Sequence, residues 1–97
     1  MEESKMSDTA IKQQLRRAKQ AAIKRCETMG YHIIPSDNSL FCFLAVRKAE
    51  IRMVHVVVGK VDDKTRKKIE AFVPPGVCSK EIWCWQNSHN FEIIEII

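Results

Sequence analysis

The chain has 97 residues, of which 45% are hydrophobic, and this size and composition are typical of one folded domain and exclude a disordered chain. No apolar run is long enough to cross a bilayer, so we expect no membrane span. The N-terminal segment, residues 1–7, is polar and lacks the apolar core of a signal peptide, which predicts a cytoplasmic protein. We expect residues 1–7 to be a disordered tail and residues 8–97 to form a single domain.

The basic residues are unevenly distributed along the chain. Lys and Arg total 16 against 12 Asp and Glu, which gives a net charge of +4. Between Thr9 and Met29 the only acidic residue is Glu27, whereas six residues are basic. A basic surface attracts the phosphates of nucleic acids. A helix face that is merely solvated would have the same composition, so both interpretations stay open.

The first half of the chain predicts one helix and three strands. The helix covers residues 9–29, with Ser7 or Asp8 as its N-cap and Gly30 as its end. Small or apolar residues recur along this helix at steps of three and four, and this stripe should pack against a sheet. The residues of the stripe are Ile11, Leu15, Ala18, Ala22, Cys26 and Met29. The apolar runs that follow predict strands over residues 31–34, 40–46 and 51–58, separated by turns at 35–39 and 47–50.

The second half predicts one helix and two strands. Asp62 is a good N-cap for a helix over residues 63–72, and strands are expected over 80–86 and 91–97. The resulting order, α-β-β-β-α-β-β, predicts a single α/β domain with a mixed sheet flanked by helices. The strand after the second helix should run parallel to a strand of the hairpin group, and the first helix should cover one face of the sheet.

Common catalytic motifs are absent from the sequence: it has no glycine-rich phosphate loop, no C-x-x-C pair and no evident Ser-His-Asp arrangement. The cysteines are interpreted as reduced core residues, and a metal site shared with His55 or His89 is the alternative. Trp83 and Trp85 are interpreted as core or subunit contacts, with base stacking as the alternative. The cysteines are Cys26, Cys42, Cys78 and Cys84.

Several segments together resemble a known family. A basic helix ends in Gly30-Tyr31, and a predicted hairpin places FCFLAVRK (residues 41–48) before RMVHVVV (52–58). After the second helix come CSKEIWCW (78–85) and FEIIEI (91–96). In the order of their elements and the pattern of their apolar residues, residues 9–97 resemble the small core of the PD-(D/E)XK nuclease superfamily, particularly Holliday-junction-resolvase-like domains. The resemblance implies a restriction-endonuclease-like fold.

The catalytic signature of that family is degenerate in this chain. In active relatives, an Asp near the start of the second strand and a Glu-x-Lys on the third hold a divalent metal. The resemblance puts Cys42 at the Asp position, His55 at the Glu position and Val57 at the Lys position. A second register puts Val58 and Lys60 at the last two positions. Mg²⁺ prefers oxygen ligands, and neither register supplies a carboxylate, so we expect a pseudo-nuclease without a metal cofactor.

Three functions follow from these observations. The first is non-catalytic, sequence-independent binding of DNA or RNA. The second is a protein-interaction or assembly subunit, a homodimer formed through the apolar C-terminal strand. The third and weakest is an active Mg²⁺-dependent nuclease with a rearranged site built from Asp37, His55 and Lys60. For the first function, the expected nucleic-acid-binding residues are Lys12, Arg16, Arg17, Lys19, Lys24, Lys64, Lys67 and Lys68.

Overall fold

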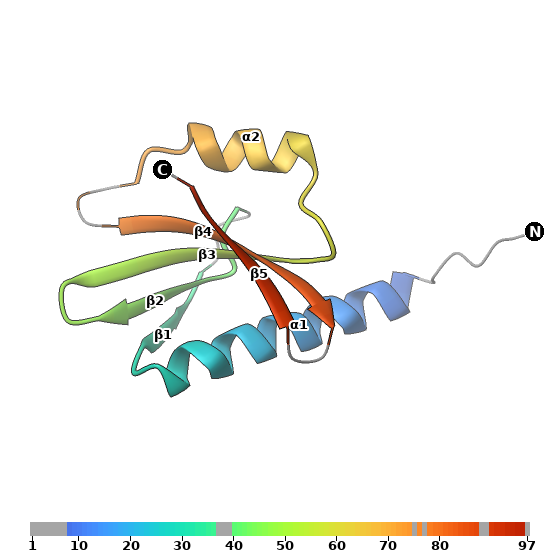
Figure 1. Cartoon of the computed structure of the whole chain (residues 1–97), viewed down its shortest axis with the longest axis horizontal. Coiled ribbons are helices and arrows are strands. Elements are labelled where there is room, and N and C mark those ends of the chain that lie inside the picture. The colour runs from blue at the N-terminus through green and yellow to red at the C-terminus, as the bar shows by residue number, and fades with distance from the viewer. Residues whose placement is uncertain (1–7, 37–39, 75, 77, 88–89, 97) are drawn as a thin grey trace, which may run out of the picture.

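A five-stranded mixed sheet with one helix on each face forms the domain (Figure 1). The computed structural model describes residues 8–36, 40–74, 76, 78–87 and 90–96. The predicted fold class and the element order α-β-β-β-α-β-β are confirmed. The elements are α1 (Asp8–Thr28), β1 (His32–Pro35), β2 (Phe43–Arg47), β3 (Glu50–Val58), α2 (Asp63–Ala71), β4 (Cys78–Asn87) and β5 (Asn90–Ile96).

The strands lie in the sheet in chain order, β1-β2-β3-β4-β5. β1, β2 and β3 form an antiparallel meander, and α2 then carries the chain across the sheet to β4. β4 runs parallel to β3, with Val56 opposite Trp83, which confirms the predicted crossover. β5 pairs antiparallel with β4 and forms one edge of the sheet, and β1 forms the other.

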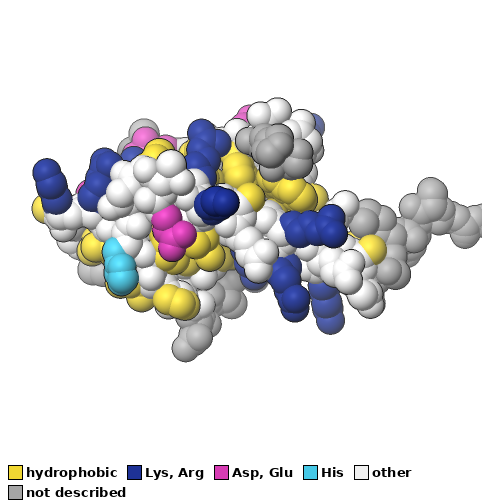
Figure 2. All heavy atoms as spheres, turned by 90° about the horizontal axis from the view of Figure 1, so that it is seen from below, with side chains coloured by type: hydrophobic (Ala, Val, Ile, Leu, Met, Phe, Trp, Pro, Cys, Tyr) yellow, Lys and Arg dark blue, Asp and Glu magenta, His cyan; other side chains and the backbone are white. Residues whose placement is uncertain are grey.

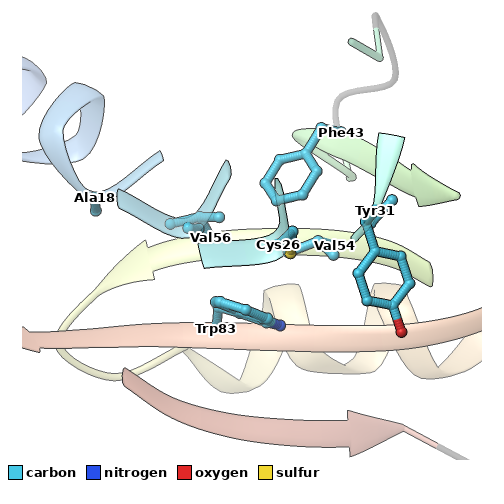
Figure 3. Close-up of a cluster of buried hydrophobic side chains, with 9 residues drawn as sticks. Ala18, Cys26, Tyr31, Phe43, Val54, Val56 and Trp83 are labelled. Carbon is cyan, nitrogen blue, oxygen red and sulfur yellow. The ribbon is translucent and has the colours of Figure 1, made fainter. Parts of the chain in front are cut away.

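α1 packs on one face of the sheet through a stripe of small residues. Ala18, Ala22 and Cys26 are completely buried, because their short side chains let the helix approach the strands closely. Figure 3 shows Cys26 of α1 among side chains contributed by the strands. Burial raises the pKa of the Cys26 thiol to about 11, so it stays protonated at neutral pH. Its partners in this core include Tyr31, Phe43, Ala45, Val54, Val56 and Trp83.

The predicted stripe is right in its middle and wrong at its ends. Ile11 is 50% exposed and Met29 is 38% exposed. Figure 1 shows the reason for the first: the N-terminal part of α1 extends beyond the edge of the sheet, where no strand can cover it. Met29 lies just past the end of the helix, where Gly30 adopts a φ of 91° as expected of a residue that ends a helix.

α2 covers the opposite face and is held at both ends. The Asp62 carboxylate accepts a hydrogen bond of 2.6 Å from the backbone N–H of Thr65, so the predicted N-cap is confirmed. At the other end, the buried Lys80 ammonium donates to backbone carbonyls of the last turn. The buried residues of the core between α2 and the sheet are Phe41, Met53, Ile69 of α2 itself, Ile82, Cys84 and Ile96.

The largest boundary error in the prediction concerns the second strand. β2 begins at Phe43, whereas residues 40–42 were expected to be strand. Side-chain contacts explain the difference, because the Leu40 carbonyl bonds to the His55 ring and the Val56 N–H donates to the Cys42 sulfur at 3.4 Å instead of to a backbone carbonyl. The expected turn at 35–39 is also corrected, since Pro35 belongs to β1, and residues 37–39 lie outside the described part.

The hairpin between β2 and β3 is tighter than predicted. Its turn is Lys48–Ala49, and Lys48 has a φ of 51°. The expected tail, residues 1–7, also lies outside the described residues. Neither helix of the described chain combines the length and the apolar character that a membrane span requires.

Candidate nucleic-acid interface

Three of the predicted binding residues lie together on one flank of α1. Lys12, Arg16 and Lys19 are spaced four and three residues apart, which places their side chains along one side of a helix. With Leu15 and Gln20 they border a shallow hollow of about 400 Å³. Among the described residues, the hollow is lined by three cations and no carboxylate, so its surroundings suit an anion.

The other predicted cations of α1 lie elsewhere on the helix. Arg17 and Lys24 are exposed. At 100° per residue, Arg17 lies about 100° around the helix axis from Arg16, and Lys24 lies about 80° from Arg16 in the same direction. The Arg25 guanidinium carbon lies 5.6 Å from the centroid of the Trp83 ring, so this cation packs against the core. Figure 2 shows Lys and Arg side chains spread along the length of the α1 side of the molecule.

The basic residues of α2 lie in a different layer from those of α1. Figure 1 shows the two helices on opposite faces of the sheet. Lys64, Lys67 and Lys68 are all exposed on α2. The two basic helices therefore do not form one continuous face.

The two helices nevertheless border the same part of the sheet. β2 pairs with β3 only as far as Phe43 opposite Val54, so residues 55–58 of β3 have no partner in β2. Lys19 of α1 lies close enough to His55 for its charge to lower the pKa of the imidazole. Lys68 of α2 lines the same cavity as His55. The charge of Lys19 therefore acts on His55 from α1, and Lys68 of α2 borders the cavity that His55 lines.

His55 lines an open surface cavity of about 600 Å³ next to α2. Its ring Nδ1 is hydrogen-bonded to the Leu40 carbonyl, and because a carbonyl only accepts, Nδ1 is the donor. Burial lowers the pKa of His55, and the charge of Lys19 lowers it further, while the Leu40 bond and Asp62 act in the opposite direction. The imidazole is therefore neutral at pH 7, with its lone pair on Nε2.

The degenerate signature positions do not converge on one site. The Cys42 sulfur accepts a hydrogen bond of 3.4 Å from the Val56 N–H, and Cys42 packs against the core beneath α1. Val57 packs against the core beneath α2. Lys60 is exposed in the connection between β3 and α2, and Asp37 lies outside the described residues. Within the described ranges, no three His, Cys, Asp or Glu side chains are grouped to hold a metal ion.

Sequence reasoning missed a polar network at the C-terminal end of α1. The Tyr31 hydroxyl donates to Glu50 at 2.7 Å, and Arg52 bridges Glu50 at 2.9 Å and Glu81 at 3.4 Å. Glu81 is buried and also accepts a hydrogen bond from the Trp83 indole at 2.9 Å. The signal was present, since Arg52 and Glu81 stand at inward positions of strands whose neighbouring inward residues are apolar.

This network restricts which groups can bind a ligand. Arg52 is neutralised by two carboxylates, so it adds little to the basic surface. The hydrogen bonds from Tyr31 and Arg52 lower the pKa of Glu50, which keeps it ionised. Trp83 is completely buried, which supports the core interpretation and leaves no exposed face for base stacking. Trp85 is partly buried, and its indole nitrogen has no hydrogen-bond partner within the described part of the chain.

Comparison with protein-family models, with curated proteins and with solved structures finds no match for this chain.

Proposed function

We propose that the protein binds nucleic acid through its phosphates and does not cut it. The proposed surface is the basic edge, defined as Lys12, Arg16 and Lys19 of α1 and Lys68 of α2. The observation that carries the proposal is the grouping of Lys12, Arg16 and Lys19 around one hollow of α1, with Lys68 of α2 in the cavity that His55 lines. A strand of phosphates lying along the side of β3 that β2 leaves uncovered, residues 55–58, would meet cations of both helices.

The chemistry of these side chains favours binding without sequence preference. Lysine and arginine bind phosphate oxygens, and each contact releases counterions from the nucleic acid, which supplies affinity for any sequence. Three of the four cations of the basic edge lie along one flank of α1, and contacts from such cations to phosphates carry no sequence information. The resemblance to nuclease-like domains supports the same class of partner, and it implies no more than that.

A non-cutting role is favoured by the chemistry of the signature positions. A thiol at Cys42, an imidazole at His55 and an isopropyl group at Val57 cannot form an oxygen-rich site for Mg²⁺. Cys42 also packs beneath α1, on the opposite side of the sheet from Val57. The proposal therefore assigns the protein a binding role, with no metal cofactor and no hydrolysis.

Two matched double variants test the proposed surface. Lys12→Gln with Arg16→Gln removes two charges from the basic edge, and Arg17→Gln with Lys24→Gln removes two from the rest of the same exposed helix. At about 0.1 M salt, each lost phosphate contact should weaken binding roughly eightfold. Fluorescence anisotropy with a labelled duplex should show a much larger loss for the first variant. Equal losses would contradict the assignment to this flank, and no binding by the unmodified protein would contradict the proposal itself.

A second candidate function is assembly through the edge of the sheet. β5 forms one edge, and its Ile93 side chain is 40% exposed. An apolar edge strand leaves backbone N–H and C=O groups that can pair with another strand. We propose a homodimer as the alternative role, in which β5 of one copy pairs antiparallel with β5 of the other.

A further inference from the structure

The cavity next to α2 has features that the binding of phosphates alone does not use. It is an open hollow of about 600 Å³ at the surface. Among the described residues, its walls combine three apolar side chains with three polar ones. The apolar residues are Leu40, Ala71 and Phe72, and the polar residues are His55, Thr65 and Lys68.

We propose that this cavity, called the His55 cavity below, receives one unpaired nucleobase of a bound strand. An aromatic base suits walls formed by Leu40, Ala71 and Phe72, because its faces are apolar and flat. A base also carries N–H groups on its edge, and the neutral His55 ring can accept one at Nε2. The inference rests on the proposed function, and it adds that the protein prefers unpaired strands to duplex.

The cations around the cavity suit the phosphates on either side of such a base. Lys68 lines the cavity itself, and Lys19 is close enough to interact with His55. Phosphates adjacent to an inserted base would therefore lie between the cation of α2 and those of α1. A duplex cannot use the cavity without unpairing and unstacking a base, which costs a few kcal/mol. Because of this cost, the protein should bind single-stranded nucleic acid more tightly than duplex.

The hydrogen bonding of His55 makes it a suitable acceptor. Because Nδ1 donates to the Leu40 carbonyl, the tautomer and the ring orientation are fixed before a ligand arrives. The lowered pKa keeps the ring neutral in spite of the nearby cations, so it accepts a hydrogen bond instead of repelling the lysines. Thr65 adds a hydroxyl that can donate or accept at the same wall.

The test compares three labelled ligands of equal length: a single strand, the same strand made abasic, and the duplex. The abasic strand keeps every phosphate and lacks every base, so the affinity ratio between the first two measures base recognition. For the unmodified protein at fixed salt, we expect the single strand to bind roughly tenfold more tightly than the abasic strand. We expect the duplex to bind no more tightly than the abasic strand.

Two variants locate the base, each with a matched control. Ala71→Phe fills the cavity and keeps every charge, and Ala49→Phe makes the same change at an exposed turn outside it. Lys68→Met removes a cation that lines the cavity, and Lys67→Met removes its exposed neighbour. Ala71→Phe should lower the single-strand to abasic ratio to about one and leave duplex binding unchanged. Lys68→Met should weaken single-strand binding more than Lys67→Met does.

The possible outcomes separate this inference from the proposed function. If the unmodified protein binds all three ligands equally, or if Ala71→Phe keeps the ratio, the His55 cavity does not receive a base, although phosphate binding stands. If none of the ligands binds at low salt, the proposed function fails and this inference fails with it. If the single-strand to abasic affinity ratio is lost in Ala71→Phe and kept in Ala49→Phe, the result supports both the proposed function and the insertion of a base into the His55 cavity.

Discussion

Lys80 offers a sharp test of how α2 is held on the sheet. Only 6% of this residue is exposed, and its ammonium donates to the carbonyls of Ile69 at 2.8 Å, Glu70 at 3.1 Å and Phe72 at 2.7 Å. The last carbonyls of a helix lack the usual partner within the helix, and this side chain bonds three of them, of which Ile69 also accepts from the Phe72 N–H at 3.2 Å. The positive charge also lies at the negative end of the helix dipole.

Lys80→Met keeps the length of the side chain and removes all three donors. Hydrogen bonds from a charged group contribute about 1.5–3 kcal/mol each, and part of that gain is offset by the cost of burying an ammonium. We expect a net loss of about 3 kcal/mol in the free energy of unfolding. For a domain of this size, that loss corresponds to a melting temperature lower by roughly 12–24 °C.

Urea denaturation followed by tryptophan fluorescence measures the effect. Lys67→Met is the matched control, because Lys67 is exposed on α2 and should change stability by no more than about 0.5 kcal/mol. Lys80→Gln retains one donor group and should fall between the two variants. If Lys80→Met unfolds within about 1 kcal/mol of the unmodified protein, the three hydrogen bonds do not hold the end of α2, and the reasoning is refuted.

Three further predictions concern pH, catalysis and assembly. Burial lowers the pKa of His55 from its ordinary 6.5, and the charge of Lys19 lowers it further, whereas the charge of Asp62 raises it. Lys68 lines the same cavity as His55. Between pH 6.5 and the lower folded pKa, the unfolded chain takes up a proton that the folded chain does not, so stability should fall as pH falls through that window. Chemical denaturation at several pH values should show this loss in the unmodified protein and a smaller one in His55→Gln. Plasmid, single-stranded and branched DNA incubated with Mg²⁺ or Mn²⁺ should stay intact, and cleavage abolished by Asp37→Ala or His55→Ala would favour a rearranged nuclease site. In analytical ultracentrifugation at micromolar concentration, a dimer that becomes a monomer in Ile93→Lys would support pairing through β5, whereas a monomer of 11.2 kDa in the unmodified protein would count against it.

The order and type of the elements could be predicted because local signals and long-range packing agree there. The Ala18, Ala22 and Cys26 stripe predicted a helix lying closely on a sheet, and all three residues are buried. Asp62 predicted the start of α2, and its carboxylate accepts the expected N-cap hydrogen bond. The apolar sequence of Ile51–Val58 predicted β3, which begins one residue earlier, at Glu50.

The candidate site could be predicted only in part. The basic residues of α1 were visible in the sequence, but their separation into two flanks depends on which side of the helix meets the sheet. The His55 cavity joins residues of β3, of α2 and of the segment before β2, so its composition follows from the crossover and not from any local pattern. The start of β2 was missed for the same reason, because the His55 ring bonds the Leu40 carbonyl and the Val56 N–H bonds the Cys42 sulfur.

The most direct test of the central claim is the salt dependence of nucleic-acid binding. Fluorescence anisotropy with a labelled duplex should give a straight line of log affinity against log salt, with a slope of roughly −3 to −4 if the four cations of the basic edge each contact a phosphate. The triple variant Lys12→Gln, Arg16→Gln and Lys19→Gln should lower the magnitude of that slope by about three, with an unchanged circular dichroism spectrum. A flat response, or a slope that the triple variant leaves unchanged, would contradict binding at the basic edge and leave assembly through β5 as the better account.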